Sequence, residues 1–157
     1  MVKMLMKSLI SKMLNSVEYT VHSNTSTLFS ESYKYADGRL VINMSEQITT
    51  AITAQSGGIY FAQPTLADFP IEFISEPVVS LSSVFNGGSS GNAWVWGRSR
   101  PSTKNPGNIY LGRGSSANSQ TYRVTVHAEG RWKNSGGVVS RLLKTLQSLT
   151  LREVIVW

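Results

Sequence analysis

The sequence contains no cysteine. The chain can therefore form no disulfide, and it lacks the thiols needed for cysteine catalysis and for thiolate zinc sites. Histidine is almost as scarce, because His22 and His127 are the only two. A hydrolytic triad needs a histidine as its base, and both of these fall on the outward-facing register of expected strands. We therefore expect no nucleophilic catalytic residue, no metal site and no cofactor.

Charged side chains are also few, at 15% of residues, whereas hydrophobic residues make up 41%. The net charge of +6 comes from the two ends of the chain. Residues 1–16 hold three lysines and no acid, and residues 134–157 hold three basic residues and one acid. The middle is almost neutral, with nine basic and eight acidic residues. This distribution argues against nucleic acid as a partner.

Long hydrophobic runs are missing. Lysines interrupt every apolar stretch of residues 1–16, so these residues do not resemble a secretory signal. No stretch approaches the roughly 20 apolar residues of a transmembrane segment. Apolar residues at spacings of three and four instead predict an amphipathic helix over residues 1–16, and a linker with a second such helix over residues 134–157. The first helix must pack on the domain, on copies of itself or on a membrane surface.

Residues 17–133 change to a period of two, which is typical of β-strands. Leu40, Ile42 and Met44 illustrate this alternation, and similar runs begin near residues 17, 69, 79 and 122. The pair Asp37-Gly38 predicts a tight hairpin with a type I′ turn. Glycine- or proline-rich breaks follow at residues 57–58, 87–91, 101–108 and 114–119. Many short strands without helical patterns between them predict an all-β domain, either an antiparallel β-sandwich or a small barrel.

Two patterns were weighed as catalytic. Residues 87–91 match the G-x-S-x-G nucleophile elbow, but an elbow is followed by a helix, whereas an aromatic strand is expected here. A glycine- and serine-rich hairpin loop explains the string without catalysis. Glycoside hydrolysis needs only two carboxylates, and no two acids of this chain form a motif that places them across one cleft. A pair shared between subunits stays open.

Aromatic residues gather at residues 92–98. Trp94, Trp96 and Arg98 share one face of the expected strand, while Ala93, Val95 and Gly97 share the other. We favour a core position for the tryptophans; the alternatives are a subunit interface and a ligand contact. In the last case, basic residues beside the loop at 101–108 would add a rim that favours anions. The candidate ligand-binding residues are Trp94, Trp96, Arg98, Arg100, Lys104, Tyr110 and Arg113.

Three segments together resemble the C-terminal tip domains of bacteriophage tail fibres and related receptor-binding proteins. The first is Tyr-Lys-Tyr-Ala-Asp-Gly-Arg-Leu at residues 33–40, and the second is Phe-Pro-Ile-Glu-Phe at residues 69–73, with Pro-Val-Val at residues 77–79. The third is Ala-Glu-Gly-Arg-Trp-Lys at residues 128–133. Glu129 departs from the family, because an apolar residue is expected before Gly-Arg-Trp. The basic C-terminal helix is a second departure.

The resemblance implies a β-sandwich similar to H-type lectins that assembles as a homotrimer. It also implies a non-catalytic protein of the phage tail, exposed outside the cell, that attaches the virion to a host-surface glycan or other receptor beside other tail or baseplate proteins. Receptor-contacting residues vary widely in such domains, so none is carried over by position. Two alternatives stay open: a glycan-degrading tail component with a carboxylate pair at a subunit interface, and a purely structural trimerisation cap.

Overall fold

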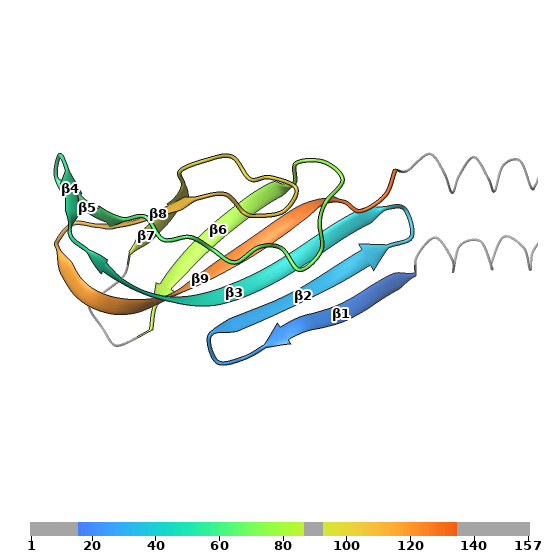
Figure 1. The fold of residues 1–157 in the computed structure, drawn as a ribbon, viewed down its shortest axis with the longest axis horizontal. Coiled ribbons are helices and arrows are strands. Elements are labelled where there is room, and N and C mark those ends of the chain that lie inside the picture. The colour runs from blue at the N-terminus through green and yellow to red at the C-terminus, as the bar shows by residue number, and fades with distance from the viewer. Residues whose placement is uncertain (1–15, 87–92, 135–157) are drawn as a thin grey trace, which may run out of the picture.

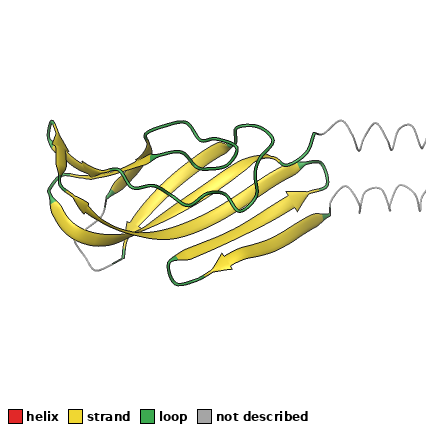
Figure 2. Ribbon diagram, in the orientation of Figure 1, coloured by secondary structure: helices red, strands yellow, loops and turns green. Residues whose placement is uncertain are grey.

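The computed structural model of the chain describes residues 16–86 and 93–134. All regular structure in these residues is β, as expected from the alternation (Figure 2). Both predicted helices lie outside the described residues. The strands are β1 (Val17–Asn24), β2 (Leu28–Tyr35), β3 (Arg39–Ile52), β4 (Ala54–Ser56), β5 (Ile59–Ala62), β6 (Val78–Phe85), β7 (Trp94–Gly97), β8 (Ile109–Arg113) and β9 (Ala117–Arg131).

The larger of two antiparallel sheets has the strand order β1-β2-β3-β9-β6 (Figure 1). Its centre is the pairing of the two longest strands, β3 and β9. One side chain in two points inward along these strands, which buries Leu40 and Ile42 from β3 and Val124 and Val126 from β9. This side of the sheet is called the inner face here, and the opposite side the outer face.

The second sheet is small, with the order β4-β5-β8-β7. It adds Ala62, Ile109 and Leu111 to the same buried cluster that the inner face of the large sheet forms. In Figure 1 it lies at one end of the long sheet, and the connections over residues 63–77 and 98–108 continue along the rest of the inner face.

The run at residues 69–73 was expected to be a strand and is irregular instead. Phe69 N–H and Phe73 N–H donate to the carbonyl oxygens of Lys104 and Thr103, at 2.7 and 2.9 Å. Both phenylalanines are buried, and their rings meet edge to face at 5.1 Å. The apolar period reflects burial against the sheet, while the backbone groups pair with a neighbouring loop rather than with a strand.

The hairpin at Asp37-Gly38 is present, but its predicted turn type is wrong. A type I′ turn needs positive φ at both central residues, and in the described residues only glycines have positive φ. Gly38, at φ 93°, donates its N–H to the Tyr35 carbonyl oxygen at 3.0 Å, and Asp37 Oδ1 accepts the Arg39 N–H at 2.9 Å. This matches a three-residue loop in which glycine takes the left-handed position.

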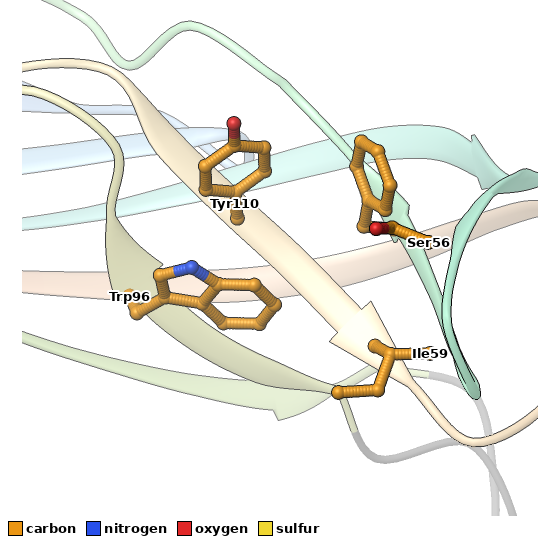
Figure 3. Close-up of a pocket in the computed structure, with 5 residues that line it drawn as sticks. Ser56, Ile59, Trp96 and Tyr110 are labelled. Carbon is orange, nitrogen blue, oxygen red and sulfur yellow. The ribbon is translucent and has the colours of Figure 1, made fainter.

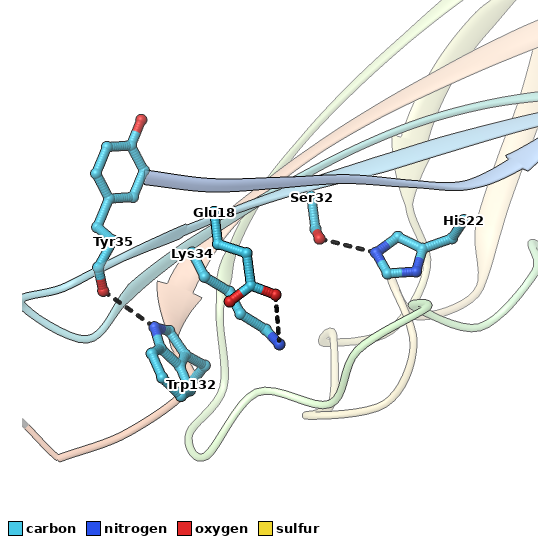
Figure 4. A network of polar contacts seen from close by, with 6 residues as sticks. All are labelled: Glu18, His22, Ser32, Lys34, Tyr35 and Trp132. Carbon is cyan, nitrogen blue, oxygen red and sulfur yellow. Dashed lines mark hydrogen bonds and ion pairs between the residues drawn. The ribbon is translucent and has the colours of Figure 1, made fainter. Parts of the chain in front are cut away.

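One of the two histidines, on edge strand β1, faces the opposite way from the prediction. His22 lies on the inner face, where its Nε2 is 2.8 Å from the hydroxyl of buried Ser32 (Figure 4). The inner face is polar here, since Lys34 and Glu18 form an ion pair at 3.9 Å. The apolar side chains of β1 therefore face outward, and Val17, Tyr19 and Val21 are exposed. His127 lies on the outer face, as predicted.

The glycine-rich run at residues 87–91 was interpreted as a hairpin loop. Its flanking strands are not hairpin partners, because β6 pairs with β9 in the large sheet and β7 pairs with β8 in the small one. The run itself lies outside the described residues. The strands on either side of the run therefore belong to different sheets, and the interpretation of the two as a hairpin is wrong.

The C-terminal end of β9 closes on the first hairpin. Trp132 donates its N–H to Gly38 O at 3.0 Å and its indole Nε1–H to Tyr35 O at 3.2 Å (Figure 4). Arg131 donates to Asp37 O at 2.6 Å. Segments almost a hundred residues apart in sequence thus form one corner of the molecule.

The middle segment reaches the same corner. Ile74 N–H donates to Arg131 O at 2.8 Å. A Cβ at Gly130 would lie 2.7 Å from Cδ1 of Phe73, so only glycine lets that ring come this close to β9. Glu129 points to the outer face and forms an ion pair with Arg39 at 3.7 Å, which explains why this position is charged.

Candidate functional site

The tryptophans of β7 point away from the core. Trp94 is 63% exposed and Trp96 39%, whereas Ala93 is buried and Val95 is half-buried on the opposite side of the strand. The division of the strand into two faces is confirmed, but the preferred core position of the tryptophans is wrong. The small residues face the core because the space between the sheets is already filled by Ile109 and Leu111 of the adjacent strand β8.

Four rings form an aromatic patch on the outside of the small sheet, namely Phe61, Trp94, Trp96 and Tyr110. Trp96 stacks on Tyr110 with ring centroids 5.4 Å apart and planes 27° apart, and Phe61 meets Tyr110 edge to face at 5.5 Å. Ser56 and Ile59 join Phe61, Trp96 and Tyr110 around a shallow pocket of about 320 Å³ (Figure 3). Strands β5, β7 and β8 thus hold these rings in fixed positions.

Gly112 sets the position of Trp96. It lies on β8 between Tyr110 and the end of the strand, opposite Trp94 in the β7 register. A Cβ at this position would come within 2.6 Å of Trp96 Cζ3. The indole therefore lies across the backbone of β8 in space that any other residue would occupy.

The basic candidates divide into three groups. The Arg98 guanidinium lies 5.8 Å from the centre of the Tyr110 ring, so it borders the aromatic patch. Arg100 and Lys104 are exposed on the loop that follows β7. Arg113 falls on the other face of β8 and donates to Gln120 Oε1 at 2.8 Å, so the structure does not bring it to the patch.

The loop over residues 98–108 is held by its own hydrogen bonds. Arg98 N–H donates to Asn108 O at 2.7 Å, and Asn108 N–H donates to the Ser99 hydroxyl at 2.8 Å. Gly107 has φ 86°, and a Cβ there would lie 2.7 Å from Ser99 O. These contacts fix the direction in which Arg98 leaves β7.

The outer face of the large sheet carries a polar cluster that the sequence does not reveal. The Glu31 carboxylate accepts hydrogen bonds from Tyr19, Tyr33 and Asn43 at 3.0, 3.1 and 2.9 Å. Asn43 Oδ1 in turn lies 2.8 Å from His127 Nδ1. Its members come from four strands, and no local motif joins them, so only the strand register reveals the cluster.

The same contacts shift three pKa values. Hydrogen bonding from Asn43, with further bonds from both tyrosines, lowers the pKa of Glu31 despite some desolvation. The hydrogen bond to Glu31 raises the pKa of Tyr19, and desolvation followed by the same carboxylate raises that of Tyr33. The carboxylate is thus stabilised in its charged form and the two phenols in their neutral form.

Several other carboxylates have structural partners. Asp37 lies in its turn, Glu46 accepts the Ala67 N–H at 2.8 Å, and Glu72 accepts the Thr103 hydroxyl at 2.9 Å. Within residues 16–86 and 93–134, no group of three or more histidine and acidic side chains is arranged to hold a metal ion. The same residues include no helix with the length and apolarity to cross a membrane.

Two solved structures are similar to this chain. One is a C-terminal part of the R1 pyocin fibre of P. aeruginosa, at 22% identity and a TM-score of 0.45, with 73% of this chain covered and 28% of that chain. The other is an N-truncated R1-type pyocin tail fibre, at 19% identity and a TM-score of 0.47, with 79% of this chain covered and 94% of that chain. Both TM-scores are below 0.5. No protein-family model and no curated protein matches the chain.

Proposed function

We propose that residues 17–133 form a β-sandwich tip domain of a phage tail fibre or related tail protein, which attaches the particle to a host-surface glycan without cleaving it. The observation that carries the proposal is the aromatic patch on the outside of the small sheet. Large exposed aromatic groups on a soluble domain usually mark a contact surface.

The patch has the chemistry of a sugar platform. The C–H groups on one face of a pyranose ring carry partial positive charge, and the face of an indole or phenol ring is negative. Trp96 and Trp94 offer such faces to solvent, and the shallow pocket beside Trp96 gives a sugar ring a boundary. Ser56, Tyr110 and Trp96 bring polar groups to the lining of this pocket, and the Ser56 hydroxyl can both donate and accept a hydrogen bond.

The family assignment rests on the three sequence segments that resemble tail-fibre tip domains. In the fold they are one structural unit, because Trp132 and Arg131 bind the first hairpin and Ile74 binds Arg131. A chance match of three short strings has no reason to produce mutually bonded segments. We infer that the resemblance reflects a shared corner, and that the domain functions as a homotrimer at the end of a fibre.

The test is a glycan array probed with the full chain and three variants. Trp96→Ala should lose most binding, and Trp94→Ala should lose part of it. Tyr19→Ala is the matched control, since Tyr19 is a similarly exposed aromatic residue at 53% exposure on the other sheet. Equal losses from all three variants, or none from Trp96→Ala, would refute the patch as the glycan site.

Chromatography of the bound sugar distinguishes the attachment protein from its alternatives. Recovery of intact oligosaccharide supports attachment without cleavage. Shortened sugar would support the glycan-degrading tail component with carboxylates shared between subunits. No binding on a broad array, with the folded chain verified by circular dichroism, would favour the structural cap.

A further inference from the structure

We infer that the sugar that stacks on Trp96 carries a negative charge, as a carboxylate or a phosphate group, which Arg98 binds. This inference rests on the proposed glycan-binding function and names the chemical class of the ligand. It depends on how charge is distributed around the aromatic patch.

Arg98 continues the line of the two tryptophans. Residues 94, 96 and 98 fall on one side of the chain as it leaves β7, and alternate residues along a strand are about 7 Å apart. The Arg98 guanidinium lies 5.8 Å from the Tyr110 ring, which itself stacks on Trp96. A charged substituent on a sugar over Trp96 would therefore be within reach of Arg98.

This guanidinium is available to a ligand. Among the described residues it forms no ion pair, since the only two ion pairs there join Lys34 to Glu18 and Arg39 to Glu129. Arg98 is exposed, and its guanidinium lies over the face of Tyr110. Guanidinium groups bind carboxylates and phosphates through two parallel hydrogen bonds, and they do so while stacked on an aromatic ring.

No acid of the small sheet competes for this position. Strands β4, β5, β7 and β8 contain no aspartate or glutamate, and none occurs between residues 93 and 128. The Glu72 carboxylate does reach this loop, but it accepts the Thr103 hydroxyl at 2.9 Å near the middle of the loop. Arg100 and Lys104 add two exposed positive charges to the same loop, so the potential beside the patch is positive.

The alternative is that Arg98 only packs on Tyr110 and that the patch takes neutral sugars. An exposed cation over an aromatic ring gains little, about 0.5–1 kcal/mol, so packing alone gives a weak reason for a charge here. Substitution by glutamine would then leave sugar preference unchanged. The two interpretations therefore predict different results.

The experiment compares three oligosaccharides of the same length and linkage, one neutral, one with a uronate and one with a phosphorylated hexose, by calorimetric titration of the full chain. We expect at least one charged sugar to bind about tenfold or more tightly than the neutral one, with the difference shrinking as salt rises. Arg98→Gln should abolish the preference and keep the neutral affinity. Arg98→Lys should keep part of the preference for the charged sugar. The positive charge remains in this variant, but a lysine cannot form the two parallel hydrogen bonds of a guanidinium.

Arg39→Gln is the matched control, because Arg39 is an exposed arginine on the large sheet that lies over the Tyr35 ring and forms an ion pair with Glu129. It lowers the net charge equally and should leave the preference intact. Equal binding of neutral and charged sugars by the unmodified chain would overturn the inference and leave the glycan-binding proposal standing. A preference that survives in Arg98→Gln would also overturn it. If no sugar binds, both the inference and the proposed function fail.

Discussion

At the scale of single residues, the contact between Trp96 and Gly112 decides whether the patch has a defined shape. A methyl group at residue 112 would overlap the Trp96 indole, because the new Cβ would lie 2.6 Å from Trp96 Cζ3. The Gly112→Ala variant should therefore turn Trp96 away from Tyr110 without removing any aromatic group. The tryptophan is partly exposed and can move, so we expect a stability loss of only about 1 kcal/mol. Glycan affinity should fall about tenfold, the value of one lost aromatic stack.

Gly114→Ala is the control for this variant, because a Cβ at Gly114 meets nothing within 4 Å and its φ is not positive. It should bind glycan like the unmodified chain. Tryptophan fluorescence would report the movement of Trp96 independently of binding. Unchanged affinity in Gly112→Ala with a shifted emission spectrum would mean that the orientation of Trp96 is irrelevant to the ligand.

The Glu31 cluster predicts how stability depends on pH. Because its hydrogen bonds hold the pKa of Glu31 below the ordinary value of 4.5, the folded chain binds this proton less readily than the unfolded chain. The resulting stability is present above pH 4.5 and is lost as pH falls through the lowered pKa. Glu31→Gln should therefore unfold at a lower temperature than the unmodified chain at neutral pH, and the gap should close on acidification.

Thermal unfolding followed by circular dichroism between neutral and acidic pH measures this gap. Glu129→Gln is the control, since Glu129 takes part in an exposed ion pair with Arg39, and such pairs contribute about 0–1 kcal/mol. Its difference from the unmodified chain should stay small throughout. A gap for Glu31→Gln that stays constant with pH would contradict the assigned hydrogen bonds.

At the scale of elements, the first hairpin is the most constrained connection. Gly38 has φ 93°, and a Cβ there would lie 2.7 Å from Lys133 O, so alanine would be strained in conformation and would also push the C-terminal end of β9 away. Gly57 offers a matched comparison, because it too has positive φ but a Cβ there meets nothing within 4 Å. We expect Gly57→Ala to cost about 1–2 kcal/mol at most, and Gly38→Ala to cost at least about 1 kcal/mol more.

Urea unfolding of the two variants gives this difference directly. The emission of Trp132 should also change in Gly38→Ala, because the indole and main chain of Trp132 bond to Tyr35 and Gly38. Equal losses of unfolding free energy in both variants would mean that the contact between the hairpin and the end of β9 contributes no measurable stability.

Sequence alternation predicted the strands β1, β3, β6 and β9, but it did not by itself identify which face of each strand is buried. In β3 and β9 the inner residues, such as Ile42 and Val126, are buried while their neighbours face solvent, so the period of two survives into the structure. In β1 the apolar residues face outward because the inner side is occupied by Ser32 and the Lys34–Glu18 pair. The period was the same in both cases, and only the neighbouring strand decided which face was buried.

At the scale of the whole molecule, the sequence predicts only the part of the candidate site that lies on a single strand. The common face of Trp94, Trp96 and Arg98 followed from local alternation. The partners Phe61 and Gly112 could not be found, because they depend on the register between strands far apart in sequence. Arg113 was misplaced for the same reason, since the pairing of β8 turns it to the other face.

The proposed trimeric state is a property of the whole molecule that the outer surface makes testable. Within the described residues no strand pairs with the outer edge of β1, and β1 exposes Val17 and Val21, each at 44%, beside Tyr19. Apolar side chains exposed on an edge strand favour association with another chain. We therefore expect light scattering to give a mass three times the 17.2 kDa of the chain. The double substitution Val17→Lys and Val21→Lys should lower that mass, because it places two like charges on the edge of every copy.

Val78→Lys is the control on the opposite edge strand β6, where the side chain is 76% exposed. If Val78→Lys dissociates the particle and the double variant does not, the copies associate through β6. A stable monomer of the unmodified chain would contradict the trimer itself, and with it the gain in avidity expected from presenting three weak glycan sites together.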